Sequence, residues 1–277
     1  MDTLPAIAIL GAGSMGAAIL SGLVQPGVAV SGPIRVTNRT EEKAAGLRSD
    51  DVISYSTQSD PNANSAAITG ARIVLVAVKP AMIPDLLGEI AEALEPDAVV
   101  ISVAAGVTIA TMEALLPPTV VVLRAMPNTP SVVGRGVPGL AAGGRASASD
   151  LAMARTVFET VGVVLEVPES MIDEVGAVSG SGPAYVFYLI EHMTQAAVDL
   201  GFTPEQASLL VNNTFLGASE LLVESGESPG ELRRRVTSPH GTTERAIAEM
   251  EKADLGAMFV RATASALARS KELAAGK

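Results

Sequence analysis

The segment Leu10-Gly11-Ala12-Gly13-Ser14-Met15-Gly16 is the strongest indication of fold in the first half of this chain. It is a G-x-G-x-x-G motif that follows the apolar run Ala6–Leu10 and opens a helix-like segment from Ser14 to about Leu23. The first glycine permits a tight turn, the second lets the backbone approach a pyrophosphate, and the third lets helix and strand pack closely. The stretch predicts a Rossmann-type dinucleotide-binding unit; the alternative is a glycine turn that holds no ligand.

Short apolar runs alternate with helix-like or turn-rich segments through the first half of the chain. This alternation is typical of βαβ units and of a parallel sheet covered on both faces. The expected strands are Ala6–Leu10, Ile34–Thr37, Ile73–Val78, Val99–Val103 and Val120–Arg124, and two weaker runs, Gly136–Ala142 and Val161–Val167, extend the series. A helix capped by Ser147 or Ser149 is expected between the two weaker runs.

The second half reads as helices alone. The expected helices are Pro183–Leu200, one capped by Thr203 that runs to about Ser225, a short one capped by Ser228, Thr243–Lys252 and Asp254–Ala274. We therefore expect an α/β dinucleotide-binding domain at residues 1–166 and an all-helical domain at residues 167–277.

The segment Pro183–Ile190 has almost no polar face. A helix that is apolar all round must be buried in something large, which predicts a homodimer or higher oligomer. The alternative is a monomeric core packed on the first domain.

Composition excludes several classes of protein. The chain has 277 residues, 48% hydrophobic and 18% charged, which does not fit a disordered protein. A net charge of −11 disfavours nucleic acid and anionic membranes as partners. Cysteine is absent and the two histidines lack metal-ligand spacing, so we expect no metal. The absence of disulfides, of a signal-peptide pattern and of an unbroken apolar span leads us to expect a cytoplasmic protein.

The residues after the second strand bear on the choice of cofactor. NAD enzymes usually place Asp or Glu there, to bind the ribose 2′-hydroxyl. Here Ile34–Thr37 is followed by Asn38, Arg39 and Thr40, and Arg39 offers a planar charged group suited to a 2′-phosphate. This predicts NADP(H), with NAD(H) left open. In the alternative, Thr40 only caps the next helix and Arg39 is solvated.

Two further loops end expected strands at the same carboxyl edge, where ligands of open α/β sheets bind. They are Ala77–Pro80 and Val103–Gly106, whose small residues leave room for a flat nicotinamide. Lys79 is either a contact of cofactor or substrate or a solvated charge.

Five blocks of the sequence resemble the pyrroline-5-carboxylate reductase family, and they occur in the family's order. They are Ala77–Pro80, Ala104–Thr108, Met126–Pro130, Ser179–Tyr185 and, as the signature segment, Val236–Ile247. The resemblance implies a Rossmann-type domain followed by an all-helical dimerisation and substrate-binding domain, with dimers often assembled as a decamer of five. It implies NAD(P)H-dependent reduction of the C=N bond of 1-pyrroline-5-carboxylate to L-proline, the last step of proline biosynthesis.

The resemblance also implies the site residues. Cofactor contacts are expected at Gly11, Ala12, Gly13, Ser14, Met15, Asn38, Asn64, Ala77, Val78, Lys79, Pro80, Ala104 and Ala105. Substrate contacts are expected at Glu169 and in the loop Ser238–Thr243, with Ser238, Gly241, Thr242 and Thr243. One departure is His240, which stands where the family usually has glycine and either narrows the pocket, adds a proton donor or points to solvent.

The loop Ser238–Thr243 precedes an expected helix, so its N–H groups and hydroxyls can hold a substrate carboxylate. Thr243, or Thr242, can hydrogen-bond the ring nitrogen and orient it. In the alternative, Ser238 and Thr243 are only helix caps. Two rival functions are a β-hydroxyacid dehydrogenase-like enzyme, which would carry a lysine shortly after Gly180-Ser181-Gly182, and a non-catalytic NADP-binding sensor.

Overall fold

The computed structural model describes residues 3–274, apart from the side chain of Leu273. Backbone contacts divide the chain into two compact units. The first contains the residues up to Ser181 together with those from Ala266 onward, and the second is Gly182–Ser265. This division does not test the domain boundary expected between residues 166 and 167, which stays a prediction.

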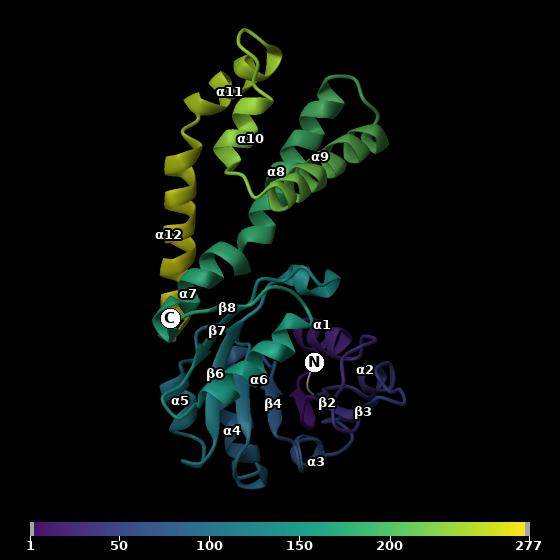
Figure 1. Cartoon of the computed structure of the whole chain (residues 1–277). Coiled ribbons are helices and arrows are strands. Elements are labelled where there is room, and N and C mark those ends of the chain that lie inside the picture. Colours follow the sequence, from purple (N-terminus) through teal and green to yellow (C-terminus); the bar gives the residue numbers. More distant parts are fainter. Residues whose placement is uncertain (1–2, 275–277) are drawn as a thin grey trace. The chain divides into compact units, whose positions relative to one another are not determined.

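Within residues 3–274, the first unit contains one sheet of eight strands in the order β3-β2-β1-β4-β5-β6-β7-β8 (Figure 1). Strands β1 to β6 are parallel, β7 runs antiparallel to β6, and β8 is parallel to β7. The strands are β1 (Ile7–Leu10), β2 (Ile34–Asn38), β3 (Val52–Ser56), β4 (Ile73–Val76), β5 (Val99–Ser102), β6 (Val121–Met126), β7 (Gly139–Ala142) and β8 (Leu165–Glu166).

All seven apolar runs singled out in the sequence contain strands, but β3 was missed. Its residues Val52–Ser56 alternate buried and more exposed positions, and β3 lies at the edge of the sheet. Two of its five residues are serine, so it lacks the continuous apolar run of a strand buried on both faces. The antiparallel direction of β7 was also not predicted.

The sheet is covered on both faces by helices, which explains why its central strands are apolar throughout. Ile7 and Ile9 face a core shared with α1 (Ser14–Leu23) and α6 (Ala148–Glu159). Ala8 and Leu10 face the other core, whose helices are α3 (Ala63–Ile68), α4 (Ile83–Ile90) and α5 (Ile109–Glu113). The remaining helical segments of this unit are α2 (Glu41–Ala45), α7 (Ile172–Val175), the 3-10 turns Pro80–Met82, Ala91–Ala93, Thr129–Val133 and Glu169–Met171, and a π-helical turn at Gly176–Gly180.

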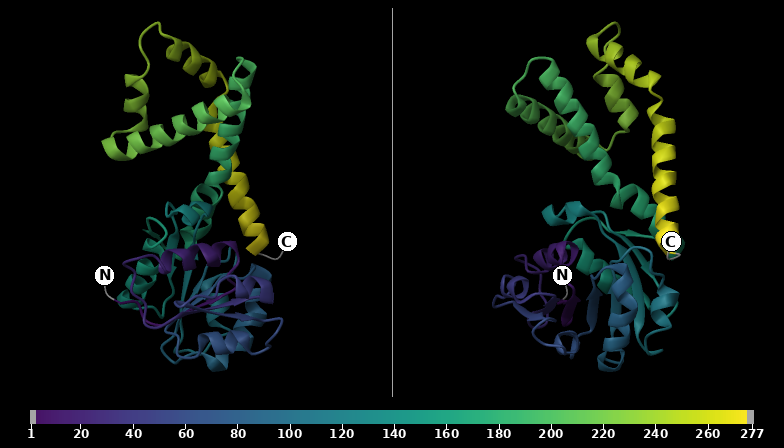
Figure 2. Two further views of the ribbon diagram at one scale, coloured as in Figure 1. Left: turned by 90° about the vertical axis from the view of Figure 1, so that its right-hand side faces the viewer. Right: turned by 180° about the vertical axis from the view of Figure 1, so that it is seen from behind.

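The second unit is helical throughout (Figure 2). Its helices are α8 (Gly182–Asp199), α9 (Pro204–Ser225), α10 (Pro229–Arg235), α11 (Thr242–Lys252) and the first part of α12 (Leu255–Ala274). Thr203 and Ser228 cap α9 and α10 through their side chains, as the sequence predicts. The fold class, an α/β Rossmann-type domain followed by an all-helical one, is confirmed.

The long helices of the second unit carry apolar side chains that the described chain leaves uncovered. None of the residues of α8 is buried, and Phe187 and Tyr188 are 64% and 61% exposed. On α9, which packs against α8, only Ala207 and Val211 are buried. The apolar sequence of α8 predicts a buried helix, but residues 3–274 of a single chain do not cover it. No helix among these residues is long and apolar enough to cross a bilayer.

A buried carboxylate at the start of α6 links that helix to the sheet. Asp150 is 6% exposed and forms a capping box with Ser147, in which the Ser147 N–H donates to Asp150 Oδ2 at 2.9 Å and the Asp150 N–H donates to Ser147 Oγ at 3.2 Å. Ser147 Oγ also donates to Asp150 Oδ2, at 2.6 Å. Arg72, just before β4, donates to Asp150 Oδ1 at 2.7 Å. Burial raises the pKa of Asp150, but the hydrogen bonds from Ser147 and the Arg72 guanidinium outweigh it and hold the pKa below its usual value.

We expect Asp150→Asn to lower the free energy of unfolding by about 1–2 kcal/mol at pH 7, because it removes charge-assisted hydrogen bonds. The folded pKa is depressed, so the stabilisation is present above the unfolded pKa of about 3.9 and is lost as the pH falls through the folded value. Urea unfolding of both proteins at pH 7 and near pH 3 should show a difference that shrinks at the lower pH.

Asp97→Asn is the matched control. Asp97 pairs with the same Arg72, at 3.0 Å, but its side chain is 73% exposed. Its removal should cost under about 0.5 kcal/mol. Equal losses in the two variants, or a difference for Asp150→Asn that does not depend on pH, would contradict the role given to burial.

Candidate active site

The turn between β1 and α1 is held by the end of β2. Gly11 has a φ of +87°, a left-handed conformation that favours glycine. Its N–H lies 3.2 Å from the carbonyl oxygen and 3.1 Å from the hydroxyl of Thr37, and the Ala12 N–H donates to the Thr37 carbonyl at 2.8 Å. A Cβ on Gly11 would lie 2.8 Å from Val78 Cγ1, so the turn also packs against the loop after β4.

The other two glycines of the motif differ sharply in their surroundings. A Cβ on Gly16 would lie 2.8 Å from the Gly11 carbonyl oxygen and 3.3 Å from Ala77, so this glycine permits close packing of α1 on the sheet. A Cβ on Gly13 would meet nothing within 4 Å. Gly13 is the N-cap of α1, and no side chain caps that helix. The open space and the uncapped N–H groups are suited to a pyrophosphate.

Asn38 and Arg39 stand at the carboxyl end of β2. Asn38, the last residue of β2, is 5% exposed, and its side-chain Nδ2 is buried without a hydrogen-bond partner among the described residues. A buried unsatisfied donor calls for a ligand or water. Arg39 is exposed, and its backbone carbonyl accepts hydrogen bonds from the Ser56 hydroxyl and the Gln58 N–H.

The remaining predicted cofactor residues, apart from Asn64, follow the carboxyl ends of neighbouring strands of the parallel sheet. β4 lies beside β1 and β5 beside β4, so the loops Ala77–Pro80 and Ala104–Ala105 follow adjacent strands. Lys79 and Pro80 are exposed there, at the start of a 3-10 turn. Asn64 lies at the start of α3, where its Nδ2 donates to both oxygens of Glu89, at 3.1 and 3.2 Å.

These features together fit a dinucleotide. Three observations carry this: the left-handed turn at Gly11, the open space beside Gly13 at the uncapped start of α1, and the unsatisfied Nδ2 of Asn38. The structure thus brings the predicted cofactor residues other than Asn64 to the carboxyl edge of the sheet, whereas Asn64 lies on α3 against Glu89 in the last turn of α4. The contact of each residue with a cofactor stays a prediction.

The predicted substrate loop, Ser238–Thr243, lies in the second unit between α10 and α11. The N-cap of α11 is Gly241, and no side chain caps this helix. Ser238 and Thr243 therefore do not act as side-chain caps of α11, which argues against the alternative that they serve only as caps. Thr242 and Thr243 occupy the first turn of α11, so their N–H groups have no intrahelical partner. The Thr243 side chain is half-buried and Ser238 is exposed.

His240 adopts a left-handed conformation, with a φ of +63°. This backbone region favours glycine and tolerates histidine only at some cost. The His240 N–H donates to Glu244 Oε2 at 2.8 Å, which holds the loop against the first turn of α11. The side chain of His240 is exposed.

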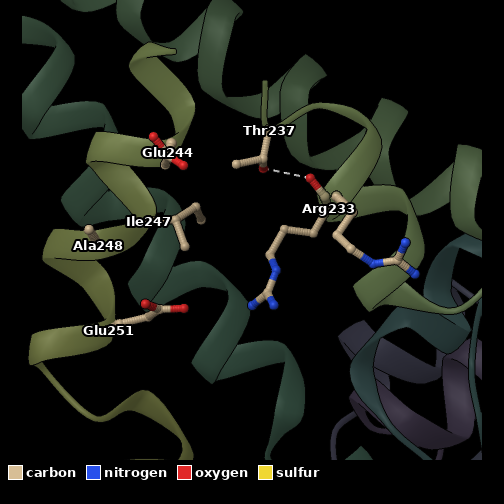
Figure 3. Close-up of a pocket in the computed structure, with 7 residues that line it drawn as sticks. Arg233, Thr237, Glu244, Ile247, Ala248 and Glu251 are labelled. Atoms are coloured by element: carbon tan, nitrogen blue, oxygen red, sulfur yellow. Dashed lines mark hydrogen bonds between the residues drawn. The ribbon is translucent and has the colours of Figure 1, made fainter. Parts of the chain in front are cut away.

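A cavity of about 240 Å³ lies between α10 and α11 (Figure 3). Its lining residues flank the loop Ser238–Thr243 on both sides and are Arg233, Arg234, Thr237, Glu244, Ile247, Ala248 and Glu251. None of the predicted substrate residues lines it. Thr237 Oγ1 donates to the Arg233 carbonyl at 2.6 Å, which closes the C-terminal turn of α10 beside this cavity.

Glu169, also predicted to contact substrate, lies in the first unit. Its Oε1 accepts hydrogen bonds from the Ile109 N–H at 2.6 Å and from Arg124 Nη1 at 3.1 Å. Arg124 is buried within β6, with 3% exposure, and sequence reasoning treated it only as the end of an apolar strand. The available signal was the charge itself, because an arginine inside such a strand requires a buried partner.

Asn128 was also not singled out as a site residue, although it lies in one of the quoted blocks. Its Nδ2 donates to the carbonyl and hydroxyl oxygens of Ser179, at 3.1 and 3.0 Å, and its Oδ1 accepts from the Val137 N–H. Asn128 thus joins the end of β6 to the π-helical turn at Gly176–Gly180. Single π-helical turns are frequent at functional sites.

Gly13→Ala should weaken NADPH binding by roughly tenfold or more and leave the thermal stability unchanged. The added methyl group meets no protein atom but occupies the space that a pyrophosphate would approach, and the φ of −75° at Gly13 suits alanine. The measurements are the NADPH dissociation constant by fluorescence and the melting temperature.

Gly11→Ala is the comparison variant. It combines a left-handed φ with a contact of 2.8 Å to Val78, so its main effect should be a lower melting temperature. Unchanged NADPH affinity in Gly13→Ala would show that the open space beside this residue does not hold the cofactor.

The comparisons with known proteins cover both units. Residues 169–273 match the family model described as pyrroline-5-carboxylate reductase dimerisation. Residues 6–106 match the model described as NADP oxidoreductase, coenzyme F420-dependent.

Individual relatives match almost from end to end. A pyrroline-5-carboxylate reductase of Corynebacterium melassecola is 41% identical over 96% of this chain and 98% of its own length. One of Pseudomonas aeruginosa is 39% identical over 98% and 97%. The solved structure of a pyrroline-5-carboxylate reductase from Coxiella burnetii superposes with a TM-score of 0.89, at 37% identity, and covers 98% of this chain and 99% of that one. The resemblance seen in the five sequence blocks is confirmed, and the chain belongs to the pyrroline-5-carboxylate reductase family.

Proposed function

We propose that this protein reduces the C=N bond of 1-pyrroline-5-carboxylate with NADPH and releases L-proline, as the last step of proline biosynthesis. The observation that carries the proposal is the 41% identity to a reductase of that name over nearly the whole of both chains. The dinucleotide-binding geometry at the edge of the sheet supports it independently. No metal takes part in this proposal.

The chain's own residues bind and orient the cofactor. We place the pyrophosphate at the start of α1, on the N–H groups of Ser14 and Met15, with Gly11, Ala12 and Gly13 shaping the turn. Asn38 Nδ2 and the Arg39 guanidinium would bind the ribose and its 2′-phosphate, and Asn64 would lie on the adenine side. The residues that would border the nicotinamide are Ala77, Val78, Lys79, Pro80, Ala104 and Ala105. When bound, the reduced nicotinamide supplies the hydride.

The substrate carboxylate is bound by the loop Ser238–Thr243, through the hydroxyl of Ser238 and the N–H groups of Gly241 and Thr242. Thr243 donates a hydrogen bond to, or accepts one from, the ring nitrogen, and so orients the imine. Its hydroxyl is a weak acid, so we assign it orientation, and the proton arrives with the iminium form of the substrate or from water. Glu169 is the other expected substrate residue, but its carboxylate is hydrogen-bonded to Ile109 and Arg124 within the first unit.

The exposed apolar surface of α8 and α9 supports a homodimer built on the helical unit, and the match of residues 169–273 to a dimerisation model agrees with this. We extend the proposal to a decamer of five dimers, with no nucleic-acid or membrane partner, in the cytoplasm. We keep residues 1–166 as the NADP-binding domain and residues 167–277 as the dimerisation and substrate-binding domain.

The purified protein should oxidise NADPH in the presence of 1-pyrroline-5-carboxylate, with proline as product. The variant Thr243→Ala should have a kcat/KM about tenfold lower, because one orienting hydrogen bond is worth about 1–1.5 kcal/mol. The measurement is the loss of NADPH absorbance together with proline detection.

The adjacent Thr242→Ala serves as the matched control and should lose less than Thr243→Ala. NADPH binding without turnover would favour the sensor alternative, and turnover of a β-hydroxyacid instead of the imine would favour the dehydrogenase alternative. Wild-type kinetics in Thr243→Ala would remove this residue from the site.

Arg39→Asp should raise the KM for NADPH by about tenfold or more, through loss of attraction and gain of repulsion at the 2′-phosphate, and should leave the KM for NADH nearly unchanged. Arg48→Asp, which alters another arginine of the same region that is already paired with Glu41, should change neither value by more than about twofold. Equal losses for the two cofactors in Arg39→Asp would exclude a 2′-phosphate contact.

A further inference from the structure

We propose that Glu169 is a positioning residue for the cofactor, acting through the loop that joins β5 to α5, rather than a contact of the substrate. This inference rests on the proposed function, because that loop contains Ala104 and Ala105, to which we assigned the nicotinamide. It replaces the substrate role expected for Glu169 from the family resemblance.

The carboxylate of Glu169 is engaged within the first unit on two sides. Oε1 accepts from the Ile109 N–H at 2.6 Å and from Arg124 Nη1 at 3.1 Å. Ile109 is the first residue of α5, where backbone N–H groups have no intrahelical partner. Glu169 therefore satisfies a helix-start donor from a position 60 residues away in the chain.

The loop between β5 and α5 is thereby fastened at both ends. At its start, the Ala104 N–H donates to the hydroxyl of Ser102, which is fully buried at the end of β5. At its end, Thr108 caps α5 by accepting from the Thr111 N–H, and Glu169 holds the next residue, Ile109. Gly106, between these two points, has a φ of +77°, so the loop turns sharply between them.

Arg124 gives this arrangement its charge balance. Its side chain is 4% exposed, and it forms ion pairs with Glu169 at 3.1 Å and with Asp173 at 3.5 Å. Arg124 lies on β6, directly opposite Ser102 of the neighbouring strand β5. The loop that contains Ala104 and Ala105 begins at the end of β5. A buried guanidinium needs a close anionic partner, and Glu169 is the nearer of its two.

Loss of the carboxylate would release the end of the loop and leave Arg124 with only the more distant Asp173. Ala104 and Ala105 would then lose their fixed position at the carboxyl edge of the sheet. Small displacements of a nicotinamide reduce its affinity and its reactivity, because hydride transfer demands a narrow range of geometry. The predicted effect therefore falls on the cofactor and on kcat, and it spares the affinity for substrate.

Three variants of the full-length protein test this: Glu169→Ala, Glu169→Gln and Asp173→Asn. Glutamine keeps an oxygen that can accept from Ile109 but loses the ion pair with Arg124, so it should rescue the function in part. Asp173→Asn removes the other anion near Arg124 and leaves the loop contact in place. The readouts are the NADPH dissociation constant without substrate, the kcat and substrate KM at saturating NADPH, and the melting temperature.

We expect the NADPH dissociation constant to rise about tenfold in Glu169→Ala, about threefold in Glu169→Gln and less than twofold in Asp173→Asn, with the substrate KM unchanged in all three. If Glu169→Ala does not fold, a weaker NADPH affinity in folded Glu169→Gln, with Asp173→Asn near wild type, supports the proposal. A wild-type protein that fails to reduce the imine would overturn the proposed function. The comparison of NADPH dissociation constants would still test the role of Glu169, because NADPH binding needs no turnover.

Three results would overturn the positioning role. A raised substrate KM with unchanged NADPH affinity would make Glu169 a substrate contact. Equal loss of NADPH affinity in Asp173→Asn and Glu169→Ala would show that the effect comes from the negative charge beside Arg124 and not from the contact of Glu169 with the loop. Wild-type NADPH affinity in both Glu169 variants would show that the loop holds its position without this residue.

Discussion

The close approach of α1 to β1 is the constraint on which the first unit depends. At Gly16 a single added carbon would lie 2.8 Å from the carbonyl oxygen of Gly11, so helix and turn are in contact with no space for a side chain. This contact sets the direction of α1 and therefore where its uncapped N–H groups point. The turn is also tied to the end of β2 through Thr37 and packs against Val78 after β4. Three strand ends thus define the corner at which we place the pyrophosphate.

Two charged side chains are buried among the described residues of this unit, Arg124 and Asp150, and each joins separate elements. Arg124 lies inside an otherwise apolar strand, β6, and pairs with Glu169 and Asp173. Glu169 is in the 3-10 turn Glu169–Met171, and Asp173 is in α7, which follows it. Asp150 does the same for α6 and the start of β4 through Arg72. A buried ion pair adds little net stability against an apolar replacement, but breaking one partner is costly, so such pairs specify how elements are placed. At the carboxyl edge of the sheet, where we place the cofactor, fixed positions of the loops matter because hydride transfer demands a narrow range of geometry.

The helical unit follows a different rule. Its helices begin with well-formed caps at Thr203 and Ser228, yet α8 buries none of its residues and α9 buries two. The free energy that stabilises most folded helices comes from packing of an apolar face. Here that face requires a surface outside residues 3–274 of one chain, which agrees with the dimerisation model that matches this region. The strained backbone at His240 lies in the same unit, in the loop that we assign to the substrate.

Several elements could be predicted because their signals are local. The glycine motif, the apolar runs of the central strands, the helix caps and the absence of a polar face on Pro183–Ile190 all follow from residues close together in the chain. Features that join distant segments depend on three-dimensional packing, which the sequence pattern does not reveal. β3 has a weak local pattern and is defined by its pairing with β2; Asn38 Nδ2 is unsatisfied only because folding buries it; and Glu169 finds Ile109 and Arg124 across 60 and 45 residues. Hydrophobic periodicity and helix caps depend on residues a few positions apart. The partner of a buried charge depends on how the whole sheet packs.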